Sequence, residues 1–393
     1  MAAQRRRAFL ATVAAAGVAG CRTTESDSSP TATESEPATT TSVPTPTEPA
    51  RIDSEWPMPA HDAGLTNATD AAGPTAPVGR LWTVETDDTP FQPILVDGVL
   101  YTVTTDGTLT ALDARTGNEQ WMISTDATAT GTPWYAGDQL YVPREEDIAA
   151  FTSDGTAQWQ TATPDRAGLV TAADGLYYAA ADPPAVVALD TDGTRRWRTE
   201  IDDPWRSRLF ATAERVLVSS GTRDSRYWTL DATSGDILGP EPRPGHDFPT
   251  ELCYRDGTVY AVDPFFGGID ATAATDAGHS WDAGAPGGGK PTMSVTAETL
   301  YYAVNSPDSP TVLAVDSATG TERWRRPLDG EIDGRVVAGT AGAFVPTTEG
   351  TVCLAEDDGT RRWSESDLTA PLTIADDLLF TATNEGVQAF RAR

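Results

Sequence analysis

The sequence predicts an all-β fold, an eight-bladed β-propeller built from four-stranded antiparallel blades. First, a short phrase with Asp, Thr, Gly and Trp recurs along the chain, as in residues 106–121 (DGTLTALDARTGNEQW) and 313–324 (LAVDSATGTERW). Second, the tryptophans that close the phrase are spaced by 39, 38, 38, 84, 43 and 39 residues. Third, no segment of residues 79–393 keeps a helical hydrophobic period for three turns. A β-rich repeat of about 40 residues is the signature of propeller blades.

The number of repeats follows from two sets of residues that recur once per copy. The closing tryptophans are Trp82, Trp121, Trp159, Trp197, Trp281, Trp324 and Trp363. The second set is an aromatic residue or leucine in an earlier strand of each copy: Tyr101, Tyr141, Tyr177, Leu217, Tyr260, Tyr301, Phe344 and Phe380. This second set gives eight copies at intervals of 36–43 residues. The interval of 84 between tryptophans is then two periods, with the missing tryptophan's place near Ile237 and Leu238.

Each copy contains four short strands separated by turns. In the first copy the strands are expected at 93–96, 99–104, 108–113 and 119–124, with Asp-Gly and Thr-Gly turns between them. The last copy, residues 371–393, has only three strands before the chain stops, whereas residues 79–86 (GRLWTVET) form an extra strand ahead of the first copy. The sequence therefore predicts that strand 79–86 completes the last blade and closes the ring, which removes an open sheet edge.

The N-terminus has the layout of an export signal followed by a tether. Residues 1–20 begin with arginines and continue with a short apolar run, and Arg6 and Arg7 open a segment (RRAFL) that resembles a twin-arginine signal. Cys21 ends a segment (VAGC) that resembles a lipobox, so it is the predicted lipidation site. Residues 21–50 are rich in Ser, Thr, Pro and Glu and cannot bury enough apolar surface to fold. We expect a lead-in segment at 51–78 and the propeller at 79–393.

The charge is strongly acidic throughout. The chain has 28 Lys and Arg residues against 58 Asp and Glu residues, a formal net charge of −30. Molar salt shortens the Debye length to about 3 Å and screens most of this self-repulsion. The pattern resembles proteins of salt-loving archaea. It argues against electrostatic binding of nucleic acid or of anionic lipid surfaces.

The repeated sequence motif resembles that of a known family. Ala111, Asp113, Thr116, Gly117 and Trp121 match the tryptophan-docking repeat of pyrroloquinoline-quinone (PQQ)-like, quinoprotein alcohol dehydrogenase-like propellers. The resemblance covers residues 79–393, and the organisation is similar to that of BamB-like lipoproteins, which are eight-bladed and anchored through an N-terminal cysteine. It implies that each tryptophan docks on the next blade, that Asp and Thr fix the turn, and that Gly supplies a positive φ. On this interpretation the phrase is structural and carries no chemistry.

Candidate chemical groups are few. The resemblance to quinoprotein dehydrogenases implies an adjacent cysteine pair and a calcium site, but Cys253 and Cys353 are a hundred positions apart. The three histidines, His61, His246 and His279, are scattered along the chain. The sequence therefore predicts no catalytic, cofactor-binding or metal-binding residues. Asn67 begins an Asn-Ala-Thr sequon, a candidate glycosylation site. The least regular region, 236–291, carries a glycine loop with the only lysine, Lys290.

Two functions follow from these observations. The first is a lipid-anchored propeller at the extracytoplasmic face of the cell membrane, a monomer that binds unidentified protein partners as a non-catalytic scaffold and uses no cofactor. The second is a PQQ-dependent dehydrogenase of the quinoprotein type. The missing cysteine pair favours the scaffold.

Overall fold

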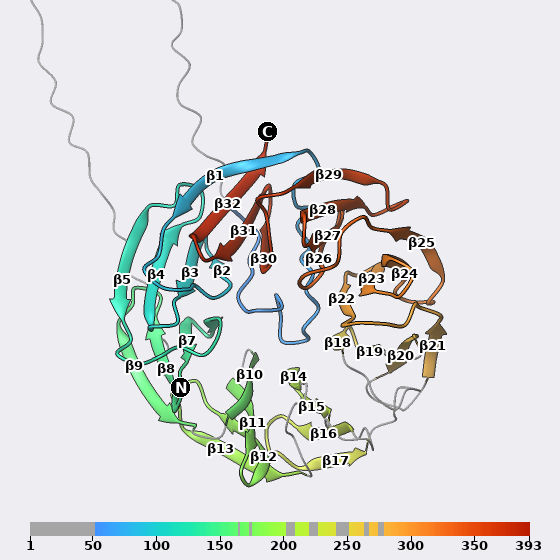
Figure 1. Ribbon diagram of the computed structural model, residues 1–393. Coiled ribbons are helices and arrows are strands. Elements are labelled where there is room, and N and C mark those ends of the chain that lie inside the picture. Colours follow the sequence, from blue (N-terminus) through green and yellow to red (C-terminus); the bar gives the residue numbers. More distant parts are fainter. Residues whose placement is uncertain are drawn as a thin grey trace, which may run out of the picture. The chain divides into compact units, whose positions relative to one another are not determined.

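The computed structural model describes residues 52–393 except 164–165, 173–174, 202–208, 220–226, 241–250, 263–266 and 274–278. The described residues belong to one compact unit, Pro49–Arg393, and form strands joined by turns and loops. Within these ranges no helix occurs, and so none that could cross a membrane is found there. Eight separate four-stranded antiparallel sheets make up the fold, which confirms the predicted eight-bladed propeller (Figure 1).

The strands of each blade follow one another from the ring's axis outward. Blades 1 and 2 consist of β2 (Ile94–Val96), β3 (Val99–Val103), β4 (Thr108–Asp113), β5 (Glu119–Ser124), β6 (Trp134–Ala136), β7 (Gln139–Pro143), β8 (Asp147–Thr152) and β9 (Ala157–Ala162). Blades 3 and 4 consist of β10 (Arg166–Ala172), β11 (Gly175–Ala181), β12 (Pro184–Leu189), β13 (Arg195–Glu200), β14 (Leu209–Ala211), β15 (Arg215–Ser219), β16 (Tyr227–Asp231) and β17 (Ile237–Pro240).

The second half of the ring repeats this order. Blades 5 and 6 consist of β18 (Glu251–Arg255), β19 (Thr258–Val262), β20 (Ile269–Ala273), β21 (His279–Ala283), β22 (Thr292–Val295), β23 (Thr299–Asn305), β24 (Pro310–Asp316) and β25 (Glu322–Pro327). Blades 7 and 8 consist of β26 (Val337–Gly339), β27 (Gly342–Thr347), β28 (Gly350–Ala355), β29 (Arg361–Glu365), β30 (Leu372–Ala375), β31 (Leu378–Thr383), β32 (Gly386–Ala392) and β1 (Val78–Val84).

Blade 8 joins the two ends of the propeller. Its outermost strand is β1, which pairs antiparallel with β32, so that Trp82 lies opposite Ala389 and Arg80 opposite Phe390. The predicted closure of the ring by an N-terminal strand is therefore confirmed, with the strand at Val78–Val84 instead of 79–86. Closure leaves no unpaired edge between the first and last blades.

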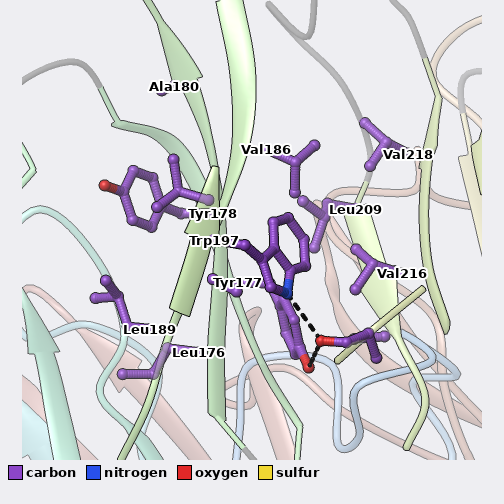
Figure 2. Close-up of a cluster of buried hydrophobic side chains, with 14 of the residues drawn as sticks. Leu176, Tyr177, Tyr178, Ala180, Val186, Leu189, Trp197, Leu209, Val216 and Val218 are labelled. Atoms are coloured by element: carbon purple, nitrogen blue, oxygen red, sulfur yellow. Dashed lines mark hydrogen bonds between the residues drawn. The ribbon is translucent and has the colours of Figure 1, made fainter. Parts of the chain in front are cut away.

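The tryptophan of one blade contacts the next blade through a hydrogen bond and a glycine. In blade 3 the indole nitrogen of Trp197 donates to the carbonyl oxygen of Ala232 in blade 4 at 2.9 Å, and the Tyr177 hydroxyl donates to the same oxygen at 3.4 Å (Figure 2). Gly235 lies under the Trp197 ring with φ +75°, and a Cβ there would be 2.5 Å from an indole carbon. This turn therefore needs glycine both for its backbone conformation and for the close approach of the ring.

The same contact recurs around the ring. The indole nitrogens of the other six repeat tryptophans also donate to backbone carbonyl oxygens, in the pairs Trp82–Ala114, Trp121–Ser153, Trp159–Thr191, Trp281–Ser317, Trp324–Glu356 and Trp363–Pro74. Each of these rings also lies 5.8–6.0 Å from an aromatic ring of its own blade. Six of the indoles thus fasten a blade to the next blade, and Trp363 of blade 7 binds the lead-in residue Pro74.

Blade 4 departs from this pattern. In blade 1, Trp121 pairs with Ala111 of the neighbouring strand, and the residue at the same register position in blade 4 is Gly239, which pairs with Thr229. The tryptophan's place is therefore taken by Gly239. Ile237 and Leu238 come just before it, and their side chains are 44% and 49% exposed. Leu217 stands where most other blades have Tyr or Phe, so both aromatic members of the contact are absent from blade 4.

Candidate functional site

The lead-in segment, Ile52–Pro77, runs inside the ring of innermost strands (Figure 1). Its backbone carbonyls accept hydrogen bonds from innermost-strand N–H groups of six blades. The pairs, in chain order of the lead-in, are Trp56–Leu95, Pro57–Tyr135, Ala63–Ala211, Gly64–Tyr254, Thr66–Val295 and Asn67–Ala338, which belong to blades 1, 2, 4, 5, 6 and 7. At blade 8, the backbone N–H of Asp376 donates to the Ser54 hydroxyl. The lead-in therefore makes a circuit of the ring.

The six donors occupy one register position. In blade 1, Leu95 pairs with Leu100, the residue just before Tyr101 of the repeated aromatic set. The other five donors pair with the residue just before the corresponding aromatic residue or leucine of their own blade. An innermost strand pairs on one side only, so N–H groups on its axial side need another acceptor. The lead-in supplies that acceptor near the turn between the first two strands.

The conformation of the lead-in is set by local contacts. His61, Leu65 and Asn67 have positive φ values of 75°, 61° and 52°, which cost energy in non-glycine residues. Asp62 stabilises this turn by accepting hydrogen bonds from the backbone N–H groups of Gly64 and Thr66. Burial alone would raise the pKa of Asp62, but hydrogen bonds from His61 and Thr66 outweigh burial and lower the pKa.

A cavity of about 590 Å³ lies between the lead-in and three of the blades. Its floor includes Pro59 and Asn67 of the lead-in, and its walls come from the segments that enter blades 1, 7 and 8. We call this cavity and its rim the mouth, defined by Gln92, Asp333, Gly334, Arg335, Val337, Thr369, Ala370, Pro371 and Leu372 together with the two floor residues.

Charged and amide groups converge at the mouth. The guanidinium of Arg335 lies 3.5 Å from a carboxylate oxygen of Glu251, and the two side chains are 40% and 11% exposed. Gln92 donates from its amide nitrogen to the carbonyl oxygen of Leu372 at 2.8 Å, which joins blade 1 to blade 8. Asp333 is exposed at the rim. The mouth can thus offer donors, acceptors and both signs of charge from a rigid frame.

The sequence did not indicate these mouth residues. Gln92, Asp333 and Arg335 lie in connections between blades, where the repeated phrase is absent. The repeat period could have placed them near the entry to an innermost strand, because such a strand begins 7–13 residues after each closing tryptophan. It could not have shown that the lead-in lines the same cavity.

The candidate residues from the sequence do not meet at one place. Arg6, Arg7 and Cys21 lie outside the described residues, and so does His246, so export and lipidation stay predictions. Asn67 is 2% exposed, and its side-chain nitrogen donates to the carbonyl oxygen of Met293 at 3.1 Å. A glycosylating enzyme would therefore find this nitrogen buried in the folded chain, and its glycosylation also stays untested.

The described residues do not fit the quinone site that the fold resemblance implies. Cys253 lies in β18 and Cys353 in β28, two blades apart, and both thiols are buried. Burial raises the pKa of Cys253 well above its usual value and that of Cys353 to about 12. Within the described ranges, no three His, Cys, Asp or Glu side chains gather as a metal site.

Comparison with solved structures shows the same fold in proteins of different kinds. BamB from Moraxella catarrhalis has a TM-score of 0.62 at 16% identity, covering 80% of this chain and 99% of that chain. Quinohemoprotein alcohol dehydrogenase from Comamonas testosteroni has a TM-score of 0.64 at 14% identity, covering 86% of this chain and 80% of that chain. At such identities the likeness shows the fold alone.

Sequence comparison is more specific. The chain is 28% identical over 171 residues to the outer membrane protein assembly factor BamB of Nitrosomonas eutropha, which spans 41% of this chain and 42% of that relative. The family described as outer membrane protein assembly factor BamB matches residues 79–167, 144–238 and 255–391, more than half of the chain. The chain therefore belongs to the family of the outer membrane protein assembly factor BamB.

Proposed function

We propose that this chain is a non-catalytic scaffold that binds partner proteins at its mouth, as a monomer held by lipid on Cys21 at the extracytoplasmic face of the cell membrane. The observation that carries the proposal is the group of polar side chains at the mouth. The lead-in is held to the ring by backbone contacts, whereas the mouth presents the Arg335–Glu251 pair, Asp333 and Gln92. Loops on a rigid frame are where binding residues usually lie.

The family supports a protein partner. The relative from Nitrosomonas eutropha is named an assembly factor, a role exercised on other proteins. The net charge of −30 favours a partner with basic side chains over a nucleic acid. The acidic composition is typical of salt-loving archaea, which have no outer membrane. We therefore propose that this chain binds proteins, as the family name implies, but not that it acts at an outer membrane.

Affinity purification from native membranes at molar salt tests the proposed binding face. The mouth variant Arg335→Glu reverses the charge that faces Glu251. The matched control, Arg361→Glu, makes the same change on the outer strand of blade 7, where Arg361 is 59% exposed. We expect proteins recovered with the wild type and the control to be lost from the mouth variant. Equal recovery with both variants would contradict the proposed face.

The proposed anchor has its own test. Replacing Cys21 with Ser should release a folded protein into the medium, because a lipid chain would no longer hold it to the bilayer. Replacing Arg6 and Arg7 with Lys should block export and leave the protein inside the cell. A Cys21→Ser protein that stays in the membrane fraction would show that lipid on Cys21 is not the anchor.

A further inference from the structure

The seam between blades 4 and 5 lacks the fastening that the tryptophans provide elsewhere. Gly239 occupies the tryptophan's register position in blade 4, and Leu217 replaces the aromatic residue that would pack on it. In the part of the chain that the structure describes, no repeat tryptophan donates a hydrogen bond across this seam.

Two consecutive residues of the lead-in bridge this seam. The carbonyl oxygen of Ala63 accepts from the N–H of Ala211 in blade 4 at 3.2 Å. The carbonyl oxygen of Gly64 accepts from the N–H of Tyr254 in blade 5 at 2.7 Å. The two hydrogen bonds therefore tie the innermost strands β14 and β18 to two adjacent peptide units of the lead-in.

Side chains reinforce the same bridge. The rings of Phe210 in blade 4 and Tyr254 in blade 5 stack with centroids 6.0 Å apart and planes 18° apart. Leu65 of the lead-in packs against the buried cluster that contains Phe210, Leu217 and Leu252. The lead-in thus adds an apolar side chain as well as two carbonyls at this seam.

The close approach requires a glycine. A Cβ on Gly64 would lie 2.1 Å from the carbonyl oxygen of Tyr254, which is backbone and cannot rotate away. The next residue, Leu65, holds φ at +61°, and Asp62 caps the turn through the N–H of Gly64 at 3.0 Å. We call residues Asp62–Leu65 the clasp.

We propose that the clasp replaces the missing tryptophan contact, and that the ring opens at the blade 4–blade 5 seam when the lead-in detaches. The lead-in also bonds to blades 1 and 2, through Trp56 and Pro57. That seam keeps its own fastening, since the Trp121 indole donates to the carbonyl oxygen of Ser153 at 3.0 Å. Detachment therefore leaves a tryptophan contact between blades 1 and 2. Among the described residues, the seam between blades 4 and 5 then keeps only apolar packing such as that of Phe210 on Tyr254. The contact of the clasp with blades 4 and 5 is independent of which partner the mouth binds.

Hydrogen exchange on the full-length chain tests this proposal residue by residue. The variant Gly64→Ala forces the clasp away from Tyr254, and Gly284→Ala is the matched control because a Cβ there meets nothing within 4 Å. In Gly64→Ala we expect the amides of Ala211 and Tyr254 to exchange about ten-fold faster or more, and those of Leu95 and Tyr135 less than about three-fold faster. The control should match the wild type.

Two further measurements cover the case in which Gly64→Ala fails to fold. Leu65→Ala keeps the backbone and removes the side chain from the cluster, and it should give the same pattern with smaller increases. In the wild type itself, the amides of Ala211 and Tyr254 should exchange faster than those of Leu95 and Tyr135. Equal exchange in the two pairs, or a uniform rise across all six blades in the variants, would overturn the proposal and make the lead-in a segment without a preferred seam.

Discussion

The indole nitrogen of Trp363 donates a hydrogen bond to the carbonyl oxygen of Pro74, 289 residues earlier in the chain, at 3.0 Å. In most other blades the acceptor lies in the turn before the outermost strand of the next blade, but blade 8 has no such turn because β1 and β32 are the two ends of the propeller. The lead-in supplies the substitute. Gly73, with φ +71°, packs so closely on Phe344 that a Cβ would lie 2.5 Å from its ring. The lead-in is thus part of the ring.

Removal of the lead-in should destabilise the propeller. A chain that starts at Val78 loses ten backbone hydrogen bonds between the lead-in and the described part of the propeller, the buried Trp56 side chain and the acceptor for Trp363. At about 1 kcal/mol per hydrogen bond and about 2–3 kcal/mol for a buried aromatic side chain, we expect Tm to fall by roughly 10 °C or more. Thermal melts followed by circular dichroism measure the change. A chain that starts at Ile52 is the control and should melt like the full-length protein; equal Tm values for the two truncations would contradict this prediction.

The glycine under each tryptophan should be intolerant of substitution. Gly235→Ala places a Cβ 2.5 Å from the Trp197 ring at a φ of +75°, and strain of this kind costs about 1–3 kcal/mol. Urea unfolding at fixed KCl should show that loss. Gly284→Ala, where a Cβ meets nothing within 4 Å, should stay within about 0.5 kcal/mol of the wild type. A Gly235→Ala protein as stable as this control would mean that the ring does not rest on the glycine.

Salt should stabilise the folded chain. With a net charge of −30, the carboxylates repel one another across the domain in dilute buffer, where the Debye length at 0.01 M is about 30 Å. At molar salt this length falls to about 3 Å, so only near neighbours still interact. We expect Tm to rise steeply between 0.1 M and 2 M KCl, with sodium sulfate as a control for solute exclusion. An unchanged Tm would show that the acidic surface is not an adaptation to salt.

Acid should weaken the turns of the repeat. Hydrogen bonds from Thr104 and Thr108 lower the pKa of Asp106, and hydrogen bonds from Arg323 and Thr319 lower that of Asp316. A carboxyl group whose pKa is lowered by folding stabilises the fold above its unfolded value and loses that contribution as pH falls through the folded value. At 2 M KCl, where repulsion is screened, Tm should be level from pH 7 to about 5 and fall below about pH 4. A Tm that rises below pH 4 would contradict this assignment.

The repeat could be predicted because strands and turns leave a local signal. Inner strands such as β4 are buried almost throughout, whereas β5 alternates between exposed and half-buried residues, and both patterns recur with the period of the blades. The strand at Val78–Val84 was recognisable because the last copy is one strand short. These features depend on residues within one period of each other.

The lead-in circuit and the mouth could not be predicted in the same way. Carbonyl oxygens carry no residue identity, so the bonds from Ala63 and Gly64 to blades 4 and 5 leave no pattern in the sequence. The Arg335–Glu251 pair joins residues of blades 7 and 5 that come together only when the ring closes. The sequence placed the missing tryptophan of blade 4 near Ile237 and Leu238, and only the pairing of Gly239 with Thr229 identifies Gly239 as the residue at that position.

Photo-cross-linking in native membranes at molar salt tests the proposed binding at the mouth most directly. A photoreactive amino acid replaces Asp333 at the rim of the mouth in one protein and Arg361 on the outer strand of blade 7 in the other. Both positions are exposed, so both probes can reach a bound protein. We expect a discrete cross-linked product from position 333 that position 361 does not give. The same products from both positions, or none from position 333, would contradict binding at the mouth.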